Sequence, residues 1–160
     1  MAIGKSASLR DVMSSYPTGV TVVTGLDDGG EPYGLTVNSF TSLSLDPPLV
    51  LVCIGRASSS HDRLVAAPNF TINVLSAEQG DIATRFSTRP SEGRFDSVRW
   101  SPSALGAPVI EEGVAWLDCS VQEVLSGGDH SIIFGKVEGA ATSDRAPLMF
   151  YRGRLSSTVG

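Results

Sequence analysis

Hydrophobic and polar residues alternate along much of the first third of the chain, and this pattern predicts β-strands. Residues 19–26 and 33–45 both alternate in this way, and a turn rich in glycine and aspartate separates them. These two segments predict a β-hairpin closed at residues 27–32. Residues 48–55, PLVLVCIG, are an uninterrupted apolar run and predict a strand buried on both faces.

Three shorter segments place their apolar residues at helical spacing. Residues 8–16 do so behind Ser8, a candidate N-cap, and residues 58–68 begin with a serine run that is also typical of a cap. Residues 77–87 predict a third helix with one apolar face. All three helices are short, so we expect them to decorate a sheet.

Strand character returns in the second half of the chain. The glycines at 127 and 128 predict a second hairpin, and residues 88–112, rich in proline, glycine and serine, predict a long, partly ordered loop. The further segments with strand character are 69–76, 114–126, 131–142 and 147–157. Because these strands pair mostly with sequence neighbours, the pattern favours a mainly β, antiparallel barrel over a parallel βαβ sheet.

Length and charge narrow the class of protein. A chain of 160 residues suits a single domain, taken here as residues 1–160. Its net charge of −5, without a basic run, does not favour binding to nucleic acid or to an anionic membrane. The N-terminal residues lack the apolar core of a signal peptide, and no apolar run approaches the ~20 residues of a membrane span, so we expect a soluble cytoplasmic protein.

Several kinds of catalytic centre have little support in the sequence. Cys53 and Cys119 have no metal-ligand spacing; we expect reduced thiols, with a disulfide between them as the alternative. The sequence has no phosphate-binding GKS/T loop and no GxSxG elbow. A Ser-His-acid triad would have to use His61 or His130, the only histidines, and is not favoured.

Polar side chains in three places are candidates for ligand binding. Hydroxyl and amide groups lie on both faces of the segment 36–44, which suggests the lining of a flat polar ligand; strand hydroxyls bonded to backbone are the alternative. The serine run at 58–60, with Arg56 and Arg63 nearby, suggests either an anion site or an ordinary cap. Arg85 and Arg89 suggest either a further anion site or a solvated helix end.

Two features near the C-terminus add to these candidates. His130 follows a tight turn, where it either caps the hairpin or faces a ligand at the barrel mouth. Phe150 and Tyr151 precede Arg152 and are either core residues or a stacking surface beside a cation.

Taken in order, several segments resemble the short-chain NAD(P)H:flavin oxidoreductase family. The segments are YPTGVTVVT, GLTVNSFTSLSLDPPLVLVCI, SSS, NFTINVLSAEQ, FS, GDHSIIFGKV and PLMFYRG, and they span about residues 9–155. The resemblance implies a homodimer of six-stranded antiparallel split β-barrels with a few short helices. It also implies hydride transfer from NADH or NADPH to FMN or FAD, with reduced flavin diffusing to a separate monooxygenase.

The resemblance also implies a set of site residues. The flavin ring would be lined by Gly34, Leu35, Thr36, Val37, Asn38 and Ser39, with Val52, Cys53 and Ile54 along it. The ribityl chain and phosphate would be approached by Ser58, Ser59, Arg85, Phe86 and Ser87. The nicotinamide would lie near His130 of the motif Gly128, Asp129 and His130, and the aromatic pair would be Phe150 and Tyr151.

The chemistry implied by the resemblance explains what the sequence lacks. Flavin and nicotinamide carry the redox reaction themselves, so the protein must supply a pocket and hydrogen-bond donors and needs no nucleophile or metal. We assign residues 36–39 to ring polarisation, the serines and Arg85 to the phosphate, and His130 to orienting the nicotinamide. Two alternatives stay open: a flavoprotein that retains its flavin, and a non-catalytic flavin- or haem-binding sensor.

Overall fold

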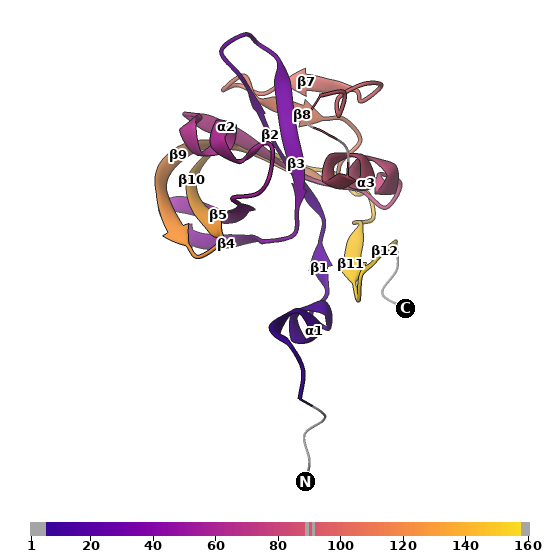
Figure 1. Cartoon of the computed structure of the whole chain (residues 1–160). Coiled ribbons are helices and arrows are strands. Elements are labelled where there is room, and N and C mark those ends of the chain that lie inside the picture. Colours follow the sequence, from indigo (N-terminus) through magenta and orange to yellow (C-terminus); the bar gives the residue numbers. More distant parts are fainter. Residues whose placement is uncertain (1–5, 89, 91, 158–160) are drawn as a thin grey trace.

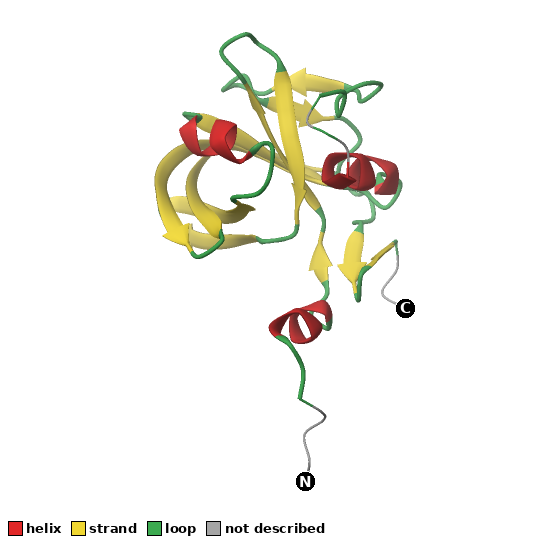
Figure 2. Ribbon diagram, in the orientation of Figure 1, coloured by secondary structure: helices red, strands yellow, loops and turns green. Residues whose placement is uncertain are grey.

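An antiparallel seven-stranded sheet that curls into a barrel dominates the computed structural model, which describes residues 6–88, 90 and 92–157 (Figures 1 and 2). The strand order is β3-β2-β6-β9-β10-β5-β4, and β3 also contacts β5 across the barrel. The strands are β2 (Thr21–Leu26), β3 (Pro32–Val37), β4 (Phe40–Leu45), β5 (Pro48–Gly55), β6 (Asn69–Val74), β9 (Ala115–Gly127) and β10 (His130–Thr142). The expected antiparallel barrel class is confirmed.

The strand count differs from the expected six because the segment 33–45 is not one strand. It breaks after Val37, and its two halves become β3 and β4, which lie at opposite ends of the strand order. The break is held by Ser39, whose carbonyl accepts from the Cys53 N–H and whose hydroxyl donates to the Cys53 carbonyl. The predicted hairpins β2–β3 and β9–β10 are both confirmed.

Two clusters of buried side chains make up the core, and β2 contributes to both. The cluster inside the barrel includes Val23, Phe70 and Ile133, whereas the cluster outside it includes Val22 and Phe86. Consecutive buried residues show that β2 and β6 are buried on both faces. The expectation that residues 48–55 form such a strand is wrong. In β5 buried residues alternate with half-buried ones, because only its inner face packs into the barrel.

Three short helices are attached to the barrel. Helix α1 (Leu9–Ser14) begins with the predicted cap, since Ser8 and Asp11 form a reciprocal capping box. It extends away from the barrel at the N-terminal end and buries none of its residues (Figure 1). Helix α2 (His61–Ala66) lacks the predicted cap: Ser60 occupies the position, but its side chain makes no capping bond. Helix α3 (Gly80–Thr88) packs on β2 and β3.

The segment 88–112 is more regular than predicted. It contains a hairpin of β7 (Trp100–Pro102) and β8 (Pro108–Ile110). The Asn73 side chain fastens this hairpin to the barrel, since its amide donates to the Pro108 carbonyl and its oxygen accepts from the Ile110 N–H. A small separate sheet joins β1 (Thr18–Gly19), β11 (Met149–Tyr151) and β12 (Arg154–Ser156).

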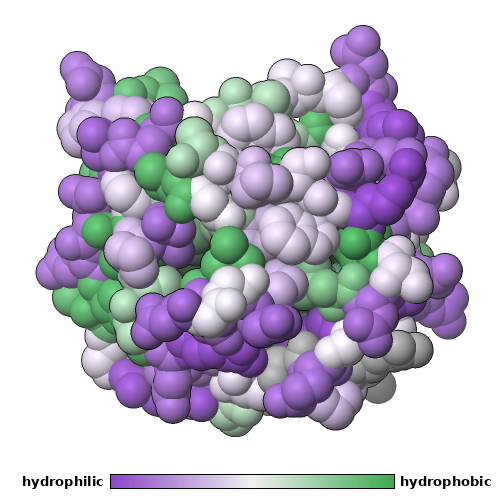
Figure 3. Space-filling model, turned by 90° about the horizontal axis from the view of Figure 1, so that it is seen from above, coloured by the Kyte–Doolittle hydropathy of each residue, from purple (hydrophilic) through white to green (hydrophobic). Residues whose placement is uncertain are grey.

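The two ends of the barrel differ in how many apolar side chains they expose. The end that carries the β2–β3 turn shows small apolar patches interrupted by polar side chains (Figure 3). Apolar side chains on α1, at the other end, are strongly exposed, as in Leu9 at 78% and Val12 at 58%. Within the described ranges, no helix combines the length and apolar character needed to cross a bilayer.

Candidate active site

Two pockets meet at Asn38, just after the end of β3. The smaller, of about 360 Å³, lies between β3, α3 and the β11–β12 hairpin, and we call it the hairpin pocket. The larger, of about 680 Å³, lies between the α1–β1 segment, β4 and β5, and we call it the barrel-side pocket. Asn38 lines both. Each has the size of a small-molecule site.

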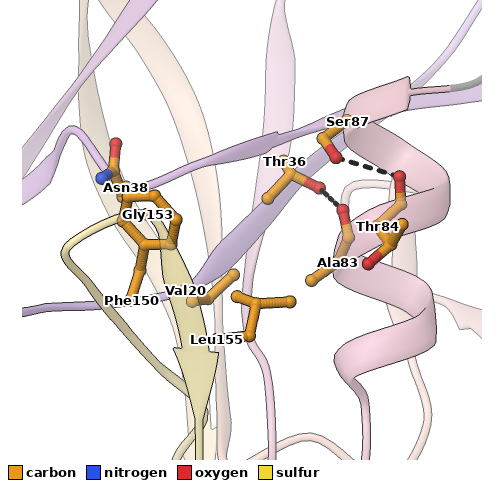
Figure 4. Close-up of a pocket in the computed structure, with 9 residues that line it drawn as sticks. All are labelled: Val20, Thr36, Asn38, Ala83, Thr84, Ser87, Phe150, Gly153 and Leu155. Atoms are coloured by element: carbon orange, nitrogen blue, oxygen red, sulfur yellow. Dashed lines mark hydrogen bonds between the residues drawn. The ribbon is translucent and has the colours of Figure 1, made fainter.

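Hydroxyl groups line the hairpin pocket, but their hydrogens already bond to the protein (Figure 4). Thr36 Oγ1 donates to the Ala83 carbonyl at 2.7 Å, and Ser87 Oγ donates to the Thr84 carbonyl at 2.9 Å. Figure 4 shows α3 on one side of the pocket and Phe150 on the other. As they stand, Thr36 and Ser87 can accept hydrogen bonds from a ligand but do not donate to it.

The barrel-side pocket has an apolar wall from β4 and β5. Phe40, Leu51 and Cys53 line it, and Ser39 Oγ donates to the Cys53 carbonyl at 2.7 Å. Burial raises the pKa of the Cys53 thiol above its ordinary value, so the group is neutral and behaves as a small apolar residue. This wall suits the face of a flat, mostly apolar ring system.

Two side chains at these pockets have donors that the fold does not use. The exposed Asn38 amide makes no hydrogen bond to another described residue, and the Thr18 hydroxyl is buried without a partner among those residues. Thr18 lines the barrel-side pocket from β1. A buried hydroxyl without a partner is costly, and a ligand oxygen or nitrogen would satisfy it. The sequence analysis missed Thr18, although it stands within the quoted segment YPTGVTVVT.

Several residues expected to contact the flavin have buried side chains. Those expected at the ring are Leu35, Val37, Val52 and Ile54, and the one expected near the ribityl chain and phosphate is Phe86. Gly34 is tightly packed as well, since a Cβ there would lie 2.7 Å from the Val23 carbonyl oxygen. These residues shape the strands and could offer a ligand only backbone groups, so their contact with flavin stays a prediction.

The arginines considered as phosphate ligands point elsewhere in this structure. Arg56 binds the Gly128 carbonyl and Ser126, while Arg63 lies over the Tyr33 ring. Arg85 donates to the Asp96 carbonyl and does not line the hairpin pocket. Arg89 lies outside the described residues. None of Arg56, Arg63 and Arg85 has a hydrogen bond to the predicted phosphate-binding serines among the described residues. The phosphate role of Arg85 stays a prediction.

His130 begins β10 beside the last residue of β5. A Cβ on its register partner Gly55 would lie 3.6 Å from the His130 Nε2 atom, so the ring lies against that glycine. Gly55 and Cys53 share one face of β5, which places His130 roughly 7 Å along the strand from the apolar wall. The imidazole is 45% exposed and free to meet a ligand that extends beyond the barrel-side pocket.

The Gly128–Asp129 turn holds His130 in place. Asp129 Oδ1 lies 2.7 Å from His130 Nδ1, and this hydrogen bond, followed by the charge of the imidazole, lowers the pKa of the Asp129 carboxyl. Arg56 fixes the turn through its backbone N–H to the Asp129 carbonyl and its Nε to the Gly128 carbonyl. The sequence predicted the position of His130 but not this use of Arg56.

The two C-terminal aromatic residues have different surroundings. Phe150 lines the hairpin pocket, whereas Tyr151 is 40% exposed, with the Arg152 guanidinium 5.2 Å from its ring centre. Gly153 and Leu155 of the same hairpin complete that side of the pocket. Phe150 is therefore the member of the pair placed to contact a ligand there.

Fold and site together define a class of protein: an antiparallel barrel with two pockets at the end of one strand, one of them with an apolar wall. Comparison with known proteins gives the family, since residues 13–158 match the flavin reductase like domain. The chain belongs to the flavin reductase-like family.

Relatives and solved structures agree with this assignment. The reductase component of the flavin-dependent trigonelline monooxygenase of Acinetobacter baylyi is 45% identical, over 95% of this chain and 49% of that protein. The NADH-dependent FAD reductase of Streptomyces globisporus is 45% identical, over 92% of this chain and 82% of that protein. The Streptomyces globisporus C-1027 NADH:FAD oxidoreductase, solved in complex with NAD and FAD fragments, has a TM-score of 0.86 at 44% identity, over 92% of this chain and 88% of that chain. This chain spans about half the length of the Acinetobacter baylyi reductase component and of a probable flavin reductase of Rhizobium meliloti, to which it is 45% and 44% identical.

Proposed function

We propose that this protein is an NAD(P)H-dependent flavin reductase that transfers hydride from NADH or NADPH to FMN or FAD. The observation that carries the proposal is the pair of pockets that meet at Asn38, with an apolar wall on β5 and His130 at the end of that wall. Family membership and the activities for which its relatives are named support it. We further propose that reduced flavin leaves to serve a separate monooxygenase.

Each part of the site has a task in this proposal. Flavin and nicotinamide, when bound, supply the redox chemistry, and the protein positions them and excludes water. Asn38 and Thr18 donate hydrogen bonds to polar atoms of the flavin ring, while Leu51 and Cys53 contact its face. The Nε2 atom of His130 forms a hydrogen bond with the nicotinamide carboxamide that orients this ring, and His130 is not required to transfer a proton.

A steady-state assay tests the proposal directly. Purified protein is mixed with NADH or NADPH and with FMN, FAD or riboflavin, and oxidation of the nicotinamide is followed by absorbance. We expect oxidation that depends on added flavin if flavin is a substrate, and a coloured protein active without added flavin if flavin stays bound. Flavin binding without any nicotinamide oxidation would instead indicate a sensor.

Replacing His130 by alanine tests the assignment of the nicotinamide. We expect the KM for the nicotinamide to rise by about tenfold, the equivalent of one lost hydrogen bond, with a smaller change in the KM for flavin. Arg56 keeps the turn in place in this variant, so the strand pairing is retained. Equal increases in both KM values would show a structural role for His130.

We also propose that the protein forms a homodimer through the face that carries α1. This helix buries none of its own residues, and α1 and the segment that follows it contribute Met13 and Tyr16 to one wall of the barrel-side pocket. Leu45, at the end of β4, is 93% exposed. A second copy of the chain would cover these side chains and close the open side of the pocket.

A further inference from the structure

Two consecutive buried residues connect the strands that we assign to the two substrates. Ser60 is 0% exposed, and its hydroxyl donates to the Gly34 carbonyl of β3 at 3.2 Å. His61 is 6% exposed, and its Nε2 lies 2.9 Å from the Ser131 hydroxyl of β10. The start of α2 therefore spans the gap between the segment that leads to Asn38 and the segment that carries His130.

On the flavin side, the connection is reinforced by a buried arginine. Arg94 is 6% exposed and donates to the same Gly34 carbonyl at 2.6 Å, with its Nη1 3.4 Å from Ser60 Oγ. Gly34 pairs with Thr24 of β2 on its other side. The backbone of β3 is thus held from both sides, two residues before Thr36 at the hairpin pocket.

On the nicotinamide side, the connection reaches the residue that follows His130. Ser131 is 4% exposed and points into the barrel, while His130 points outward, because side chains alternate along a strand. His61 Nδ1 lies 2.8 Å from the Asp62 carboxylate. A carboxylate at Nδ1 favours a proton on that nitrogen, so Nε2 accepts the hydrogen bond from the Ser131 hydroxyl.

Ser131, His61 and Asp62 have the hydrogen-bond order of a hydrolytic triad but not its accessibility. A triad serine must reach a substrate carbonyl, and Ser131 Oγ is enclosed by the barrel core beside Ile54 and Ile133. Its hydrogen bond to His61 therefore holds two elements together.

We propose that Ser60 and His61 are positioning residues that set the spacing between the flavin-binding strand and His130. This inference rests on the proposed function, because it assumes that flavin lies along β3 and nicotinamide at His130. Hydride transfer requires the two rings in near contact, and a displacement of about 1 Å can cost roughly a hundredfold in rate. The two buried hydrogen bonds fix the distance between β3 and the start of β10. Ser60 and His61 do so without contacting either substrate themselves.

Replacing Ser131 tests the inference, with Ser131→Thr as the rescue variant because it keeps the hydroxyl. The readouts are the hydride-transfer rate at saturating substrates by stopped flow, the long-wavelength charge-transfer absorbance of the nicotinamide–flavin complex, and the Kd for flavin. We expect Ser131→Ala to lower the rate by about tenfold or more and to weaken the absorbance band, with the Kd for flavin within about twofold. Ser131→Thr should restore both.

Thr71→Val is the matched control. It also removes one buried hydroxyl, which donates from β6 to the Asp118 carboxylate of β9, so we expect it to lower stability without moving either substrate segment. We expect its rate and absorbance band to match those of the unmodified protein.

The outcomes separate the inference from the proposed function. If the unmodified protein oxidises NADH with flavin and Ser131→Ala keeps its full rate and band, the positioning role is overturned. A fall in Thr71→Val as large as in Ser131→Ala would also overturn it, since general loss of stability would then explain both. If the unmodified protein does not oxidise either nicotinamide, the proposed function itself fails. His61→Leu, which removes the same hydrogen bond from the other partner, provides the same comparison if Ser131→Ala does not fold.

Discussion

At the scale of single residues, the hydroxyls that line the pockets stabilise the protein itself. Thr36, Ser39 and Ser87 each donate to a backbone carbonyl. Side-chain donors that the described fold does not use itself include the Asn38 amide and the Thr18 hydroxyl. The sequence could predict that polar groups gather on this segment, but it could not predict which ones are already bonded, because that depends on contacts between distant segments such as β3 and α3.

The two cysteines should differ in reactivity because their surroundings differ. Burial, followed by the charges of Asp118 and Glu138, raises the pKa of Cys119 to about 12. Cys53 is half-buried in a pocket wall, and burial raises its pKa as well. We expect iodoacetamide at pH 8 to modify Cys53 slowly and Cys119 only after unfolding, as measured by peptide mass spectrometry. Added flavin should slow Cys53 further; unchanged labelling would place the ring elsewhere.

The contact between Asp129 and His130 should depend on pH in a defined direction. The pKa of Asp129 is lowered in the folded protein, so the contact is present above the ordinary carboxyl value of 3.8 and is lost as the pH falls through the lowered pKa. Asp129→Asn should remove the charge at every pH. We expect this variant to raise the KM for the nicotinamide at pH 7, and an unchanged KM would show that the carboxylate does not position His130.

At the scale of elements, the β7–β8 hairpin shows how a buried amide can order a segment that sequence patterns describe as a loop. Asn73 is 1% exposed and bonds to the Val22 carbonyl of β2 as well as to β8. The proline, glycine and serine residues of 88–112 indicate irregular structure. Asn73, which orders this segment, lies on β6 and is distant from it in sequence. Local patterns did predict both long hairpins, because their turns and alternating residues are adjacent in sequence.

Replacing Asn73 by alanine should destabilise the protein. The change leaves the Ile110 N–H and the Pro108 and Val22 carbonyls without this partner, and we expect the free energy of unfolding to fall by about 2–3 kcal/mol, as for other buried unsatisfied groups. Urea denaturation measures this loss. Asn69→Ala on the same strand is the control, since that half-buried side chain makes no hydrogen bond to a described residue, and it should change stability by less than about 1 kcal/mol.

At the scale of the whole molecule, the exposed apolar side chains concentrate where the candidate site is open. Leu9, Val12 and Tyr16, in α1 and just after it, are 78%, 58% and 64% exposed, and Tyr16 lines the barrel-side pocket. An isolated six-residue helix has little stability of its own in water. We therefore expect α1 to gain its order from a second copy of the chain.

The proposed dimer can be tested by its mass in solution. We expect sedimentation to give about twice the 16.8 kDa chain mass, and the double substitution Leu9→Glu and Val12→Glu to give the single chain with weaker flavin binding. Leu105→Glu, which changes an exposed leucine near β8, is the control and should leave the dimer intact. A single-chain mass for the unmodified protein at micromolar concentration would contradict the proposal.

The position of β2 between the two core clusters has a consequence for how the protein unfolds. Val23 packs inside the barrel and Val20 and Val22 pack outside it, so the same short stretch of backbone supports both clusters. Neither cluster can lose this strand without exposing the other to water. Barrel and outer layer should therefore melt in one cooperative transition, and the wall of the hairpin pocket formed by α3 should persist up to the temperature at which the barrel itself is lost.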